Sequence, residues 1–306
     1  MRILFDADSM VYGCGFAAQK TIYDYVLASE DGSELIEGIA LSKDELAATA
    51  AMLPDGWSIS YNAVAEAEPL ENALALAKRQ LVRVMEKLDK DGYKYDRLEL
   101  FLTGKGNFRD QVATIRPYKG NRVAMEKPVH YQALRRYLRE RWGAIVIDGW
   151  EADDEVAMQA ARHGYDPQEV MIVSQDKDLR TVQGLLFNYR RNTYELLTEK
   201  QALVNFYRQI LTGDATDNIV GCYRTGEAAA TRLIQESMTE REMYDAVLGE
   251  VEKSLERKGC PYSGMTAEAV VLETGRLLHM YRHPLEVVKL WEPPAREGSN
   301  DPKSQG

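Results

Sequence analysis

The stretch AIVIDGWEADDEVAMQAA, residues 144–161, runs from a β-branched apolar segment directly into a cluster of carboxylates. Residues 144–148 are typical of a buried strand, whereas residues 153–161 carry apolar side chains at helical spacing. Like charges this close repel one another, and a buried carboxylate without a partner costs several kcal/mol. The end of this strand therefore needs a cationic partner. The acidic residues concerned are Asp148, Glu151, Asp153, Asp154 and Glu155.

Strand-like and helical segments alternate along the first two thirds of the chain. This alternation is typical of βαβ units, so we expect an α/β fold with a central, mostly parallel sheet and helices on both faces. In such sheets ligands bind beyond the carboxyl ends of the strands. The expected strands are residues 2–6, 98–102, 144–148, 170–174 and 185–189, and the expected helices are residues 70–89, 129–142 and 153–161.

Three regions depart from this alternation. Residues 20–68 have strand-like segments around a turn at residues 30–33, and we expect a small antiparallel insertion within an α/β core of residues 1–197. Residues 198–291 are helical in pattern, and the polar tail, residues 292–306, is expected to be disordered. Helix starts are marked by Ser42 with Glu45, Thr198 with Gln201, Thr239 with Glu242, and Thr266.

Composition limits the class of protein. With 306 residues, 45% hydrophobic and 28% charged, the chain can bury a large core. Its apolar runs are far shorter than the ~20 residues that span a bilayer, and acids in its first eight residues argue against a signal peptide. The three cysteines are odd in number and widely spaced, which favours a reducing cytoplasm over a disulfide framework or a Cys-based zinc site. They are Cys14, Cys222 and Cys260.

The charge of the chain is unevenly distributed. The net charge is −10, but residues 104–141 contain ten basic and three acidic residues, a segment charge of +7. Such a segment can bind a phosphate backbone, although it can also be a solvated amphipathic face. The sequence thus keeps nucleic acid among the expected partners.

Further acids follow other predicted strands. One acid at a strand end can be explained as a helix N-cap, which is our interpretation of Asp8 and an alternative for Asp153. A whole set at one sheet edge is tolerable only if hard cations neutralise it, and oxygen-only ligands favour Mg²⁺ or Mn²⁺ over Zn²⁺. Two such ions suit phosphodiester displacement. The acids are Asp6, Glu151, Asp153, Asp154, Asp176 and Asp178, with Asp214 and Asp217 opening the helical region.

Several motifs, taken in order, resemble one family. They are ILFDAD, FLTGKGNFRD, PYKGNR, KPVHY, EADD, SQDKD, GDATDN and GMTAEA with GRLLHMYR. Together they resemble the 5′-nuclease (flap-endonuclease) superfamily, and most closely the T7-type bacteriophage 5′-3′ exonucleases. The resemblance covers most of the chain and implies a PIN-like core, a helical arch formed by the basic segment, and a helical DNA-binding subdomain with a helix-hairpin-helix-like motif.

The resemblance also implies roles for individual residues. The metal ligands, or their immediate support, would be Asp6, Glu151, Asp153, Asp154, Asp176 and Asp178, with Asp214 and Asp217 serving mainly a second metal. Lys119 and Arg122 of the arch motif would reach the scissile phosphate, and Tyr118 would stack on a base or pack internally. Phosphate contacts are expected from Arg109 and Arg116. His279 and His283 have metal-like spacing but no third ligand, which favours a surface pair.

One motif departs from the family pattern. Residues 221–234, GCYRTGEAAATRLI, keep Gly221 and Gly226 but have Glu227 and Ala228 where basic residues are common. Backbone N–H groups there can still hold a DNA phosphate. The departure disfavours the K⁺ ion that the motif would otherwise imply.

The function implied is a Mg²⁺-dependent 5′-3′ exonuclease or flap endonuclease that works by a two-metal mechanism. Its substrates would be DNA with free 5′ ends or flaps and RNA annealed to DNA, and its products would carry 5′-phosphates. The setting would be phage replication, through primer removal or host DNA degradation, in the host cytoplasm. Two alternatives stay open: a PIN-type single-strand ribonuclease and a catalytically silent structure-specific DNA-binding protein.

Overall fold

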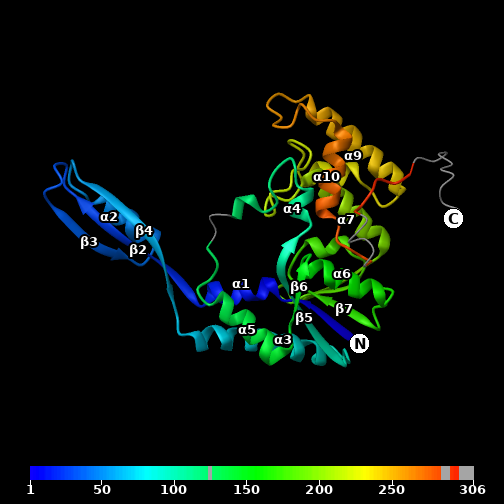
Figure 1. The fold of residues 1–306 in the computed structure, drawn as a ribbon, viewed down its shortest axis with the longest axis horizontal. Coiled ribbons are helices and arrows are strands. Elements are labelled where there is room, and N and C mark those ends of the chain that lie inside the picture. Colours follow the sequence, from blue (N-terminus) through cyan, green and yellow to red (C-terminus); the bar gives the residue numbers. More distant parts are fainter. Residues whose placement is uncertain (123–125, 284–289, 296–306) are drawn as a thin grey trace. The chain divides into compact units, whose positions relative to one another are not determined.

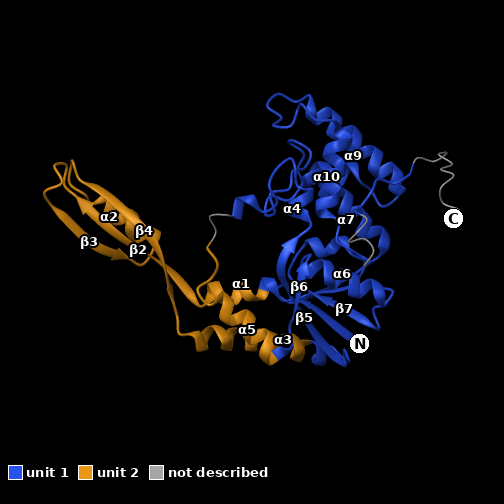
Figure 2. Cartoon of the chain, in the orientation of Figure 1, with its two compact units in different colours: residues 1–9, 88–125, 142–306 blue, residues 10–87, 126–141 orange. Residues whose placement is uncertain are grey.

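The computed structural model describes residues 1–122, 126–283 and 290–295, and Figure 1 shows the arrangement of their helices and strands. The chain divides into two compact units, which Figure 2 shows in separate colours: residues 1–9, 88–125 and 142–306 in unit 1, and residues 10–87 and 126–141 in unit 2. Among the described helices, none combines the length and the apolarity needed to cross a membrane. Of the expected disordered tail, residues 296–306 lie outside the described residues.

Unit 1 is built on a six-stranded sheet with the strand order β6-β5-β1-β7-β8-β9. Neighbouring strands are parallel except for the antiparallel pair β8–β9. The mostly parallel sheet expected from the sequence is therefore confirmed. The strands are β1 (Arg2–Asp6), β5 (Arg97–Asn107), β6 (Ile145–Gly149), β7 (Val170–Val173), β8 (Gly184–Asn188) and β9 (Thr193–Leu197).

Strand β9 is not predicted by the sequence. Its five residues, TYELL, lack a β-branched run, and it pairs with β8 because a tight turn reverses the chain between them. Asn192 adopts a φ of 57° in this turn, a conformation that Asn tolerates better than most residues.

Helix α6 (Ala152–Arg162) packs against β1, β5, β6 and β7. Val156, Ala157 and Ala160 are buried in this contact, and the small alanines let the helix lie close to the sheet. Only Trp150 and Glu151 separate the end of β6 from the start of α6. This short connection puts the EADD acids at the carboxyl edge of the sheet.

The helices expected after residue 198 are present, and they belong to the same compact unit as the sheet. They pack around a buried cluster that includes Tyr207, Met243, Val247 and Val271. Thr198 and Thr239 each cap a helix in a capping box, and Thr266 caps the last helix through its side chain, as the sequence predicts. These helices are α7 (Glu199–Thr212), α8 (Glu227–Leu233), α9 (Glu240–Leu255) and α10 (Ala267–Leu278).

Unit 2 contains the insertion, residues 20–68, which forms a three-stranded antiparallel sheet in the order β3-β2-β4. The predicted hairpin and third strand are therefore confirmed. Ser42 caps α2 (Lys43–Ala51) by accepting from the backbone N–H of Glu45, whereas the Glu45 carboxylate accepts from Leu41. The strands are β2 (Gln19–Ala28), β3 (Leu35–Ala40) and β4 (Ser58–Ala67), and most of α1 (Asp8–Ala17), α3 (Leu70–Lys90) and α5 (Tyr131–Trp142) completes the unit.

Candidate active site

Asp6, Asp176 and Asp178 lie at the ends of the adjacent parallel strands β1 and β7. The Ser174 hydroxyl donates to Asp6 Oδ2 at 3.1 Å and accepts from the backbone N–H of Asp176 at 3.0 Å. The backbone N–H of Asp178 in turn donates to Asp176 Oδ1 at 2.9 Å. Gln209 of α7 donates to Asp178 Oδ1 at 2.7 Å. The convergence that parallel topology predicts thus extends to direct links between these three acids.

Without a bound cation, ionisation of these three carboxyl groups is unfavourable. Burial raises the pKa of Asp6 to about 7, and the charges of Asp8 and Asp176 contribute. Burial and the charge of Asp176 also raise the pKa of Asp178 to about 7. The pKa of Asp176 is raised as well, chiefly by burial and also by Asp217 and Asp214. A bound cation would favour the ionised form of each group and so oppose all three shifts.

Asp154, at the start of α6, is fully buried and holds an internal ion pair. Arg109 Nη1 and Nη2 donate to its two carboxylate oxygens at 2.6 and 3.0 Å, and the backbone N–H of Tyr281 donates at 3.1 Å. Asp154 also accepts from the backbone N–H of Glu151 at 3.2 Å, which completes a capping box. With these four donors, Asp154 fits the supporting role rather than that of a free metal ligand.

The position of Arg109 requires a correction. The residue begins the short helix α4 (Arg109–Val112), and its side chain is only 3% exposed. Beyond Asp154, it donates to the carbonyl oxygens of Leu277 at 2.8 Å and His279 at 3.3 Å, and it lies 3.5 Å from Glu151. The expectation of a phosphate contact is therefore wrong for this arrangement, because α10 and Asp154 take up the guanidinium.

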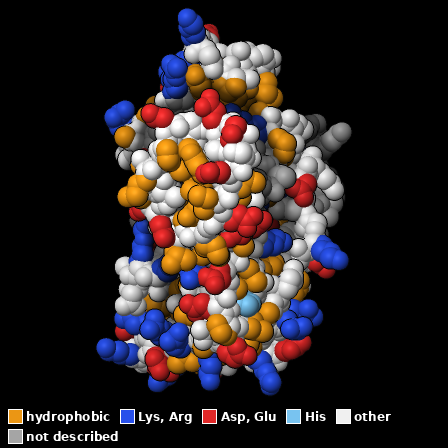
Figure 3. All heavy atoms as spheres, turned by 90° about the vertical axis from the view of Figure 1, so that its left-hand side faces the viewer, with side chains coloured by type: hydrophobic (Ala, Val, Ile, Leu, Met, Phe, Trp, Pro, Cys, Tyr) orange, Lys and Arg blue, Asp and Glu red, His pale blue; other side chains and the backbone are white. Residues whose placement is uncertain are grey.

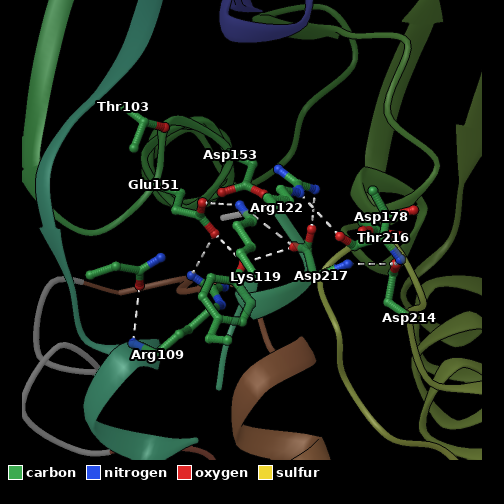
Figure 4. A network of polar contacts seen from close by, with 12 residues as sticks. Thr103, Arg109, Lys119, Arg122, Glu151, Asp153, Asp178, Asp214, Thr216 and Asp217 are labelled. Atoms are coloured by element: carbon green, nitrogen blue, oxygen red, sulfur yellow. Dashed lines mark hydrogen bonds and ion pairs between the residues drawn. The ribbon is translucent and has the colours of Figure 1, made fainter. Parts of the chain in front are cut away.

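Lys119 and Arg122 reach the acidic residues from the basic segment, as Figure 4 shows. Lys119 precedes the 3₁₀ turn η1 (Gly120–Arg122) and Arg122 ends it, and the backbone N–H of Arg122 donates to the Lys119 carbonyl at 2.9 Å. Lys119 Nζ pairs with Glu151 and lies 3.6 Å from Asp217, and Arg122 pairs with Asp217. Burial alone would raise the pKa of Glu151, but the charges of Lys119 and Arg109 lower it to about 2.

Tyr118 contacts the same two carboxylates. Its hydroxyl lies 2.6 Å from Glu151 Oε2 and 2.8 Å from Asp217 Oδ2, and its ring is 9% exposed within the helical core. The Lys119 ammonium lies 4.9 Å from the centre of this ring. Of the two roles considered for Tyr118, internal packing is the one observed. Because the hydroxyl carries one proton, it can donate to only one of these two carboxylates at a time.

Asp153 differs from its neighbours in α6. No cation is paired with it among the described residues, and its partly exposed carboxyl group accepts from the backbone N–H of Asp154 at 2.7 Å. Burial, together with the charges of Asp154 and Glu151, raises its pKa well above the usual range. In Figure 4 it lies beside Glu151 and close to the Lys119 and Arg122 side chains. Asp153 is thus the EADD carboxylate with the largest unmet charge.

The GDATDN loop presents Asp214 and Asp217. Asp214 Oδ1 accepts from the backbone N–H groups of Thr216 and Asp217 at 2.7 and 3.2 Å, and Lys177 Nζ lies 3.2 Å from Oδ2. Burial opposes ionisation, but Lys177 and these backbone donors lower the pKa of Asp214. The backbone N–H of Lys119 donates to the Asp217 carbonyl at 2.8 Å. The loop and the basic segment are therefore fixed against each other.

The two glycines of the departing motif have different surroundings. A Cβ on Gly221 would lie 2.4 Å from the backbone nitrogen of Gly213, whereas a Cβ on Gly226 meets nothing within 4 Å. Gly221 thus permits two backbone segments to cross at the base of the GDATDN loop. Gly226 precedes α8 as its N-cap, and a DNA contact there stays a prediction. The same holds for Arg116, which is exposed.

The donor set fits hard divalent cations, because every candidate ligand is a carboxylate oxygen. Among residues 1–122, 126–283 and 290–295, no three His, Cys, Asp or Glu side chains already form a metal-binding group. At Glu151 and Asp217 the carboxylates are instead paired with cations, Lys119 with Glu151 and Arg122 with Asp217. His279 ends α10 and His283 lies beyond it, so helical periodicity does not align them.

Three residues at the site are missed by sequence reasoning. Ser174 forms hydrogen bonds with Asp6 and Asp176, Lys177 pairs with Asp214, and Gln209 donates to Asp178. Lys177 and Ser174 lie next to the SQDKD acids, so their proximity could have been inferred. Gln209 lies in a helix more than thirty residues later, and no local signal indicates its contact with Asp178.

Comparison with known proteins gives relatives of one kind. No protein-family model matches the chain. It is 29% identical over 207 residues to DNA polymerase I of Bacillus caldotenax, an alignment of 60% of this chain and 23% of that protein. It is 30% identical over 160 residues to a 5′-3′ exonuclease of Buchnera aphidicola, covering 48% of this chain and 55% of the relative. The chain thus spans from about a quarter to about half of the length of these relatives.

Solved structures give similarities at lower identity. A zinc-bound 5′-exonuclease of bacteriophage T5 matches with a TM-score of 0.49 and 17% identity, over 69% of this chain and 83% of that chain. A T5 flap endonuclease complex with DNA and metal ions matches with a TM-score of 0.49 and 18% identity, over 72% and 83% of the two chains. The sequence similarity to the polymerase and exonuclease relatives and the order of the motifs both support the 5′-nuclease superfamily for this chain.

Proposed function

We propose that the chain is a divalent-metal-dependent 5′ nuclease that hydrolyses phosphodiesters of DNA at 5′ ends or flaps and leaves 5′-phosphates. The observation that carries this proposal is that two cations of the basic segment contact carboxylates from two separate segments, the start of α6 and the GDATDN loop. The contacts of Lys119 and Arg122 with Glu151 and Asp217 join these parts. The names of the curated relatives, DNA polymerase I and 5′-3′ exonuclease, support the same activity.

Two groups of carboxylates would hold the metals, which we propose to be Mg²⁺, with Mn²⁺ as a substitute. Asp6, Asp176 and Asp178 form one group, and their raised pKa values mark unmet negative charge. Glu151 and Asp153 form the other, with Asp214 and Asp217 beside them. When bound, such ions supply a nucleophile at neutral pH and stabilise the attacking and leaving oxygens. K⁺ at the Gly221–Gly226 motif is not part of the proposal.

Lys119 and Arg122 would exchange partners when substrate enters. Without substrate they offset the charges of Glu151 and Asp217, and Tyr118 holds those two carboxylates in place. A phosphate group carries the same sign of charge as these carboxylates, so both cations could pass from the carboxylates to its oxygens. Positioned there, they offset the negative charge that grows in the transition state. Asp154 and Arg109 would act only by holding the start of α6.

The finer parts of the proposal concern substrate and setting. We propose DNA and RNA annealed to DNA as substrates, and phage DNA replication, with primer removal or host DNA degradation, as the setting. The experiment distinguishes this proposal from two alternatives, a PIN-type single-strand ribonuclease and a catalytically silent DNA-binding protein.

The test is digestion of four 5′-labelled substrates in Mg²⁺: blunt duplex, flapped duplex, RNA–DNA hybrid and single-stranded RNA. The proposal predicts cleavage of the duplex, flap or hybrid, with product lengths that separate end trimming from flap cutting. Cleavage of single-stranded RNA alone would support the PIN-type alternative. Tight flap binding without cleavage in Mg²⁺ or Mn²⁺ would support the silent binder. The exposed Asp110, changed to Asn, provides a control protein prepared in the same way.

A further inference from the structure

The insertion has a charge of its own. Residues 20–68 carry ten acidic and two basic residues, a net charge of −8 within a chain of net charge −10. The basic segment, in contrast, has a charge of +7. All of the candidate metal and phosphate residues belong to unit 1, whereas the insertion belongs to unit 2. The proposed nuclease activity therefore does not account for a function of the insertion.

The two faces of the insertion sheet differ. Helix α2 covers one face, where Tyr23, Ala40 and Leu46 are buried together. Because side chains alternate along a strand, residues paired across strands share a face. Ile22 pairs with Val64, and Asp24 pairs with Ile39. The face opposite α2, here called the open face, therefore has Ile22, Val26, Leu35, Ile39 and Val64 with the acids Asp24, Glu37 and Glu66.

The open face exposes more apolar surface than scattered single residues would. Leu35 is 66% exposed, Ile39 59% and Val64 39%. In the described part of the chain, seven of the twelve exposed large hydrophobic side chains lie in the insertion, which is a sixth of the sequence, and three of these seven are on the open face. On the molecular face drawn in Figure 3, which includes the insertion, hydrophobic and acidic side chains are interspersed. Contiguous apolar patches rimmed by polar residues mark protein-binding surfaces.

Charge decides which occupant fits the open face. A segment of charge −8 repels a phosphate backbone, which disfavours nucleic acid. A second copy apposed face to face would bring Asp24 and Glu37 against their own equivalents, a like-charge contact that is unfavourable. Glu66 is already paired with Lys20 at 2.9 Å, so Asp24 and Glu37 are the acids that the face offers to a partner.

We propose that the open face binds a different protein, whose contact surface has an apolar centre and a rim of Lys and Arg. Strand β3 lies at the edge of its sheet, with Leu35 and Ile39 along it, and an exposed apolar edge strand is a liability unless something covers it. The proposal is independent of the nuclease activity.

The experiment places a photo-crosslinking amino acid at Ile39 in the full chain, produced in its native cells, with the same amino acid at Val129 as control. Val129 is also apolar, 54% exposed and in unit 2, but it lies outside the insertion. The crosslinked protein is identified by mass spectrometry, purified, and titrated against the full chain at several salt concentrations. We expect a protein other than this chain, crosslinked from position 39 only, with affinity that falls as salt rises.

Two double variants then separate the apolar and the charged contributions. Leu35→Thr with Ile39→Thr keeps a strand-forming residue at position 39 and removes apolar surface, and it should weaken binding at least tenfold. Asp24→Asn with Glu37→Gln should weaken binding and flatten its salt dependence. Val129→Thr should bind within twofold of wild type, and all variants should keep the wild-type melting temperature and DNA cleavage.

Four results would overturn the proposal. They are a crosslink to a second copy of the chain, a crosslink to nucleic acid alone, no crosslink above the position 129 control, and unchanged binding of the Leu35→Thr, Ile39→Thr variant. Failure of the wild-type protein to cleave DNA would contradict the nuclease proposal and leave the binding proposal unaffected.

Discussion

The Lys119 ammonium is paired with the carboxylate of Glu151, so a cation of the basic segment lies directly on an acid at the start of α6. The same ammonium is 3.6 Å from Asp217, and Tyr118 contacts both acids. A phosphate that enters this position can contact the Lys119 ammonium without a large movement of that side chain. The ammonium must first give up its contacts with Glu151 and Asp217. Lys119 is thus expected to act on the reaction more than on binding.

Lys119→Ala should lower the single-turnover cleavage rate at saturating DNA by roughly 10²–10³-fold, the usual effect of removing a preorganised charge donor. Lys105 is a matched control, since it belongs to the same basic segment and is exposed. Lys105→Ala should weaken binding and reduce the salt slope by about one, with little change in rate. Equal rates for both variants, with weaker binding only, would show that Lys119 is an ordinary backbone contact.

The stability of the metal-free protein should fall as pH rises from about 4 to about 7. Asp6 and Asp178 have a folded pKa of about 7, above the ordinary value for an aspartate in an unfolded chain. The folded state therefore binds protons more tightly, and the stability this contributes is complete below pH ~4 and lost through pH ~7. Glu151 acts oppositely, because its folded pKa of about 2 is lower than usual. The stability it contributes is present above pH ~4 and is lost as the pH falls toward 2.

Urea unfolding in EDTA between pH 4 and 8 measures this dependence. Asp178→Asn should flatten it, because the amide cannot ionise yet can still accept from Gln209. Mg²⁺ should restore stability at the alkaline end. A free energy of unfolding that rises across this window, or an equal slope in the variant, would contradict the assignment.

Arg109→Met should destabilise the protein by about 3–5 kcal/mol, because it leaves the buried Asp154 carboxylate without its cation. Arg116→Met removes an exposed cation and should change stability by no more than about 0.5 kcal/mol. Denaturant unfolding of both variants makes the comparison. If Arg109→Met were as stable as wild type and only its DNA affinity fell, the structural assignment would be wrong and the phosphate contact right.

Gly221→Ala should lower the free energy of unfolding by about 1–3 kcal/mol. The added Cβ would lie 2.4 Å from backbone atoms of Thr212 and Gly213, and backbone atoms cannot rotate away as a side chain can. Gly226→Ala meets open space and should cost under about 1 kcal/mol, through the poorer N-cap alone. Thermal unfolding of both proteins provides the measurement. Similar losses for the two would mean that the backbone crossing at Gly221 can relax.

The positions of the acids could be predicted because they depend on local pattern and simple topology. Asp6 and Asp176 follow apolar runs, and parallel neighbours β1 and β7 bring their carboxyl ends together. The capping residues of α7, α9 and α10 were predictable for the same reason, since each cap joins a Thr side chain to the backbone N–H three residues later.

The partners of the basic side chains could not be predicted from the sequence. Arg109 lies 45 residues from Asp154 and 168 from the Leu277 carbonyl, and only the packing of α10 brings these acceptors to it. Nothing near Tyr118 in sequence shows that its hydroxyl will join Glu151 and Asp217. Whether a basic side chain points to solvent or into the protein depends on such long-range contacts, which sequence spacing does not record.

Metal binding and cleavage by the same samples test the central claim most directly. Mn²⁺ bound to wild type, Asp178→Asn and Asp110→Asn is counted by electron paramagnetic resonance, and cleavage of a labelled flap duplex is followed with Mg²⁺ and with EDTA. We predict that wild type and Asp110→Asn bind Mn²⁺ and cleave only with metal, whereas Asp178→Asn loses bound Mn²⁺ and nearly all cleavage. Complete cleavage by wild type in EDTA, or full activity and Mn²⁺ binding by Asp178→Asn, would contradict the account.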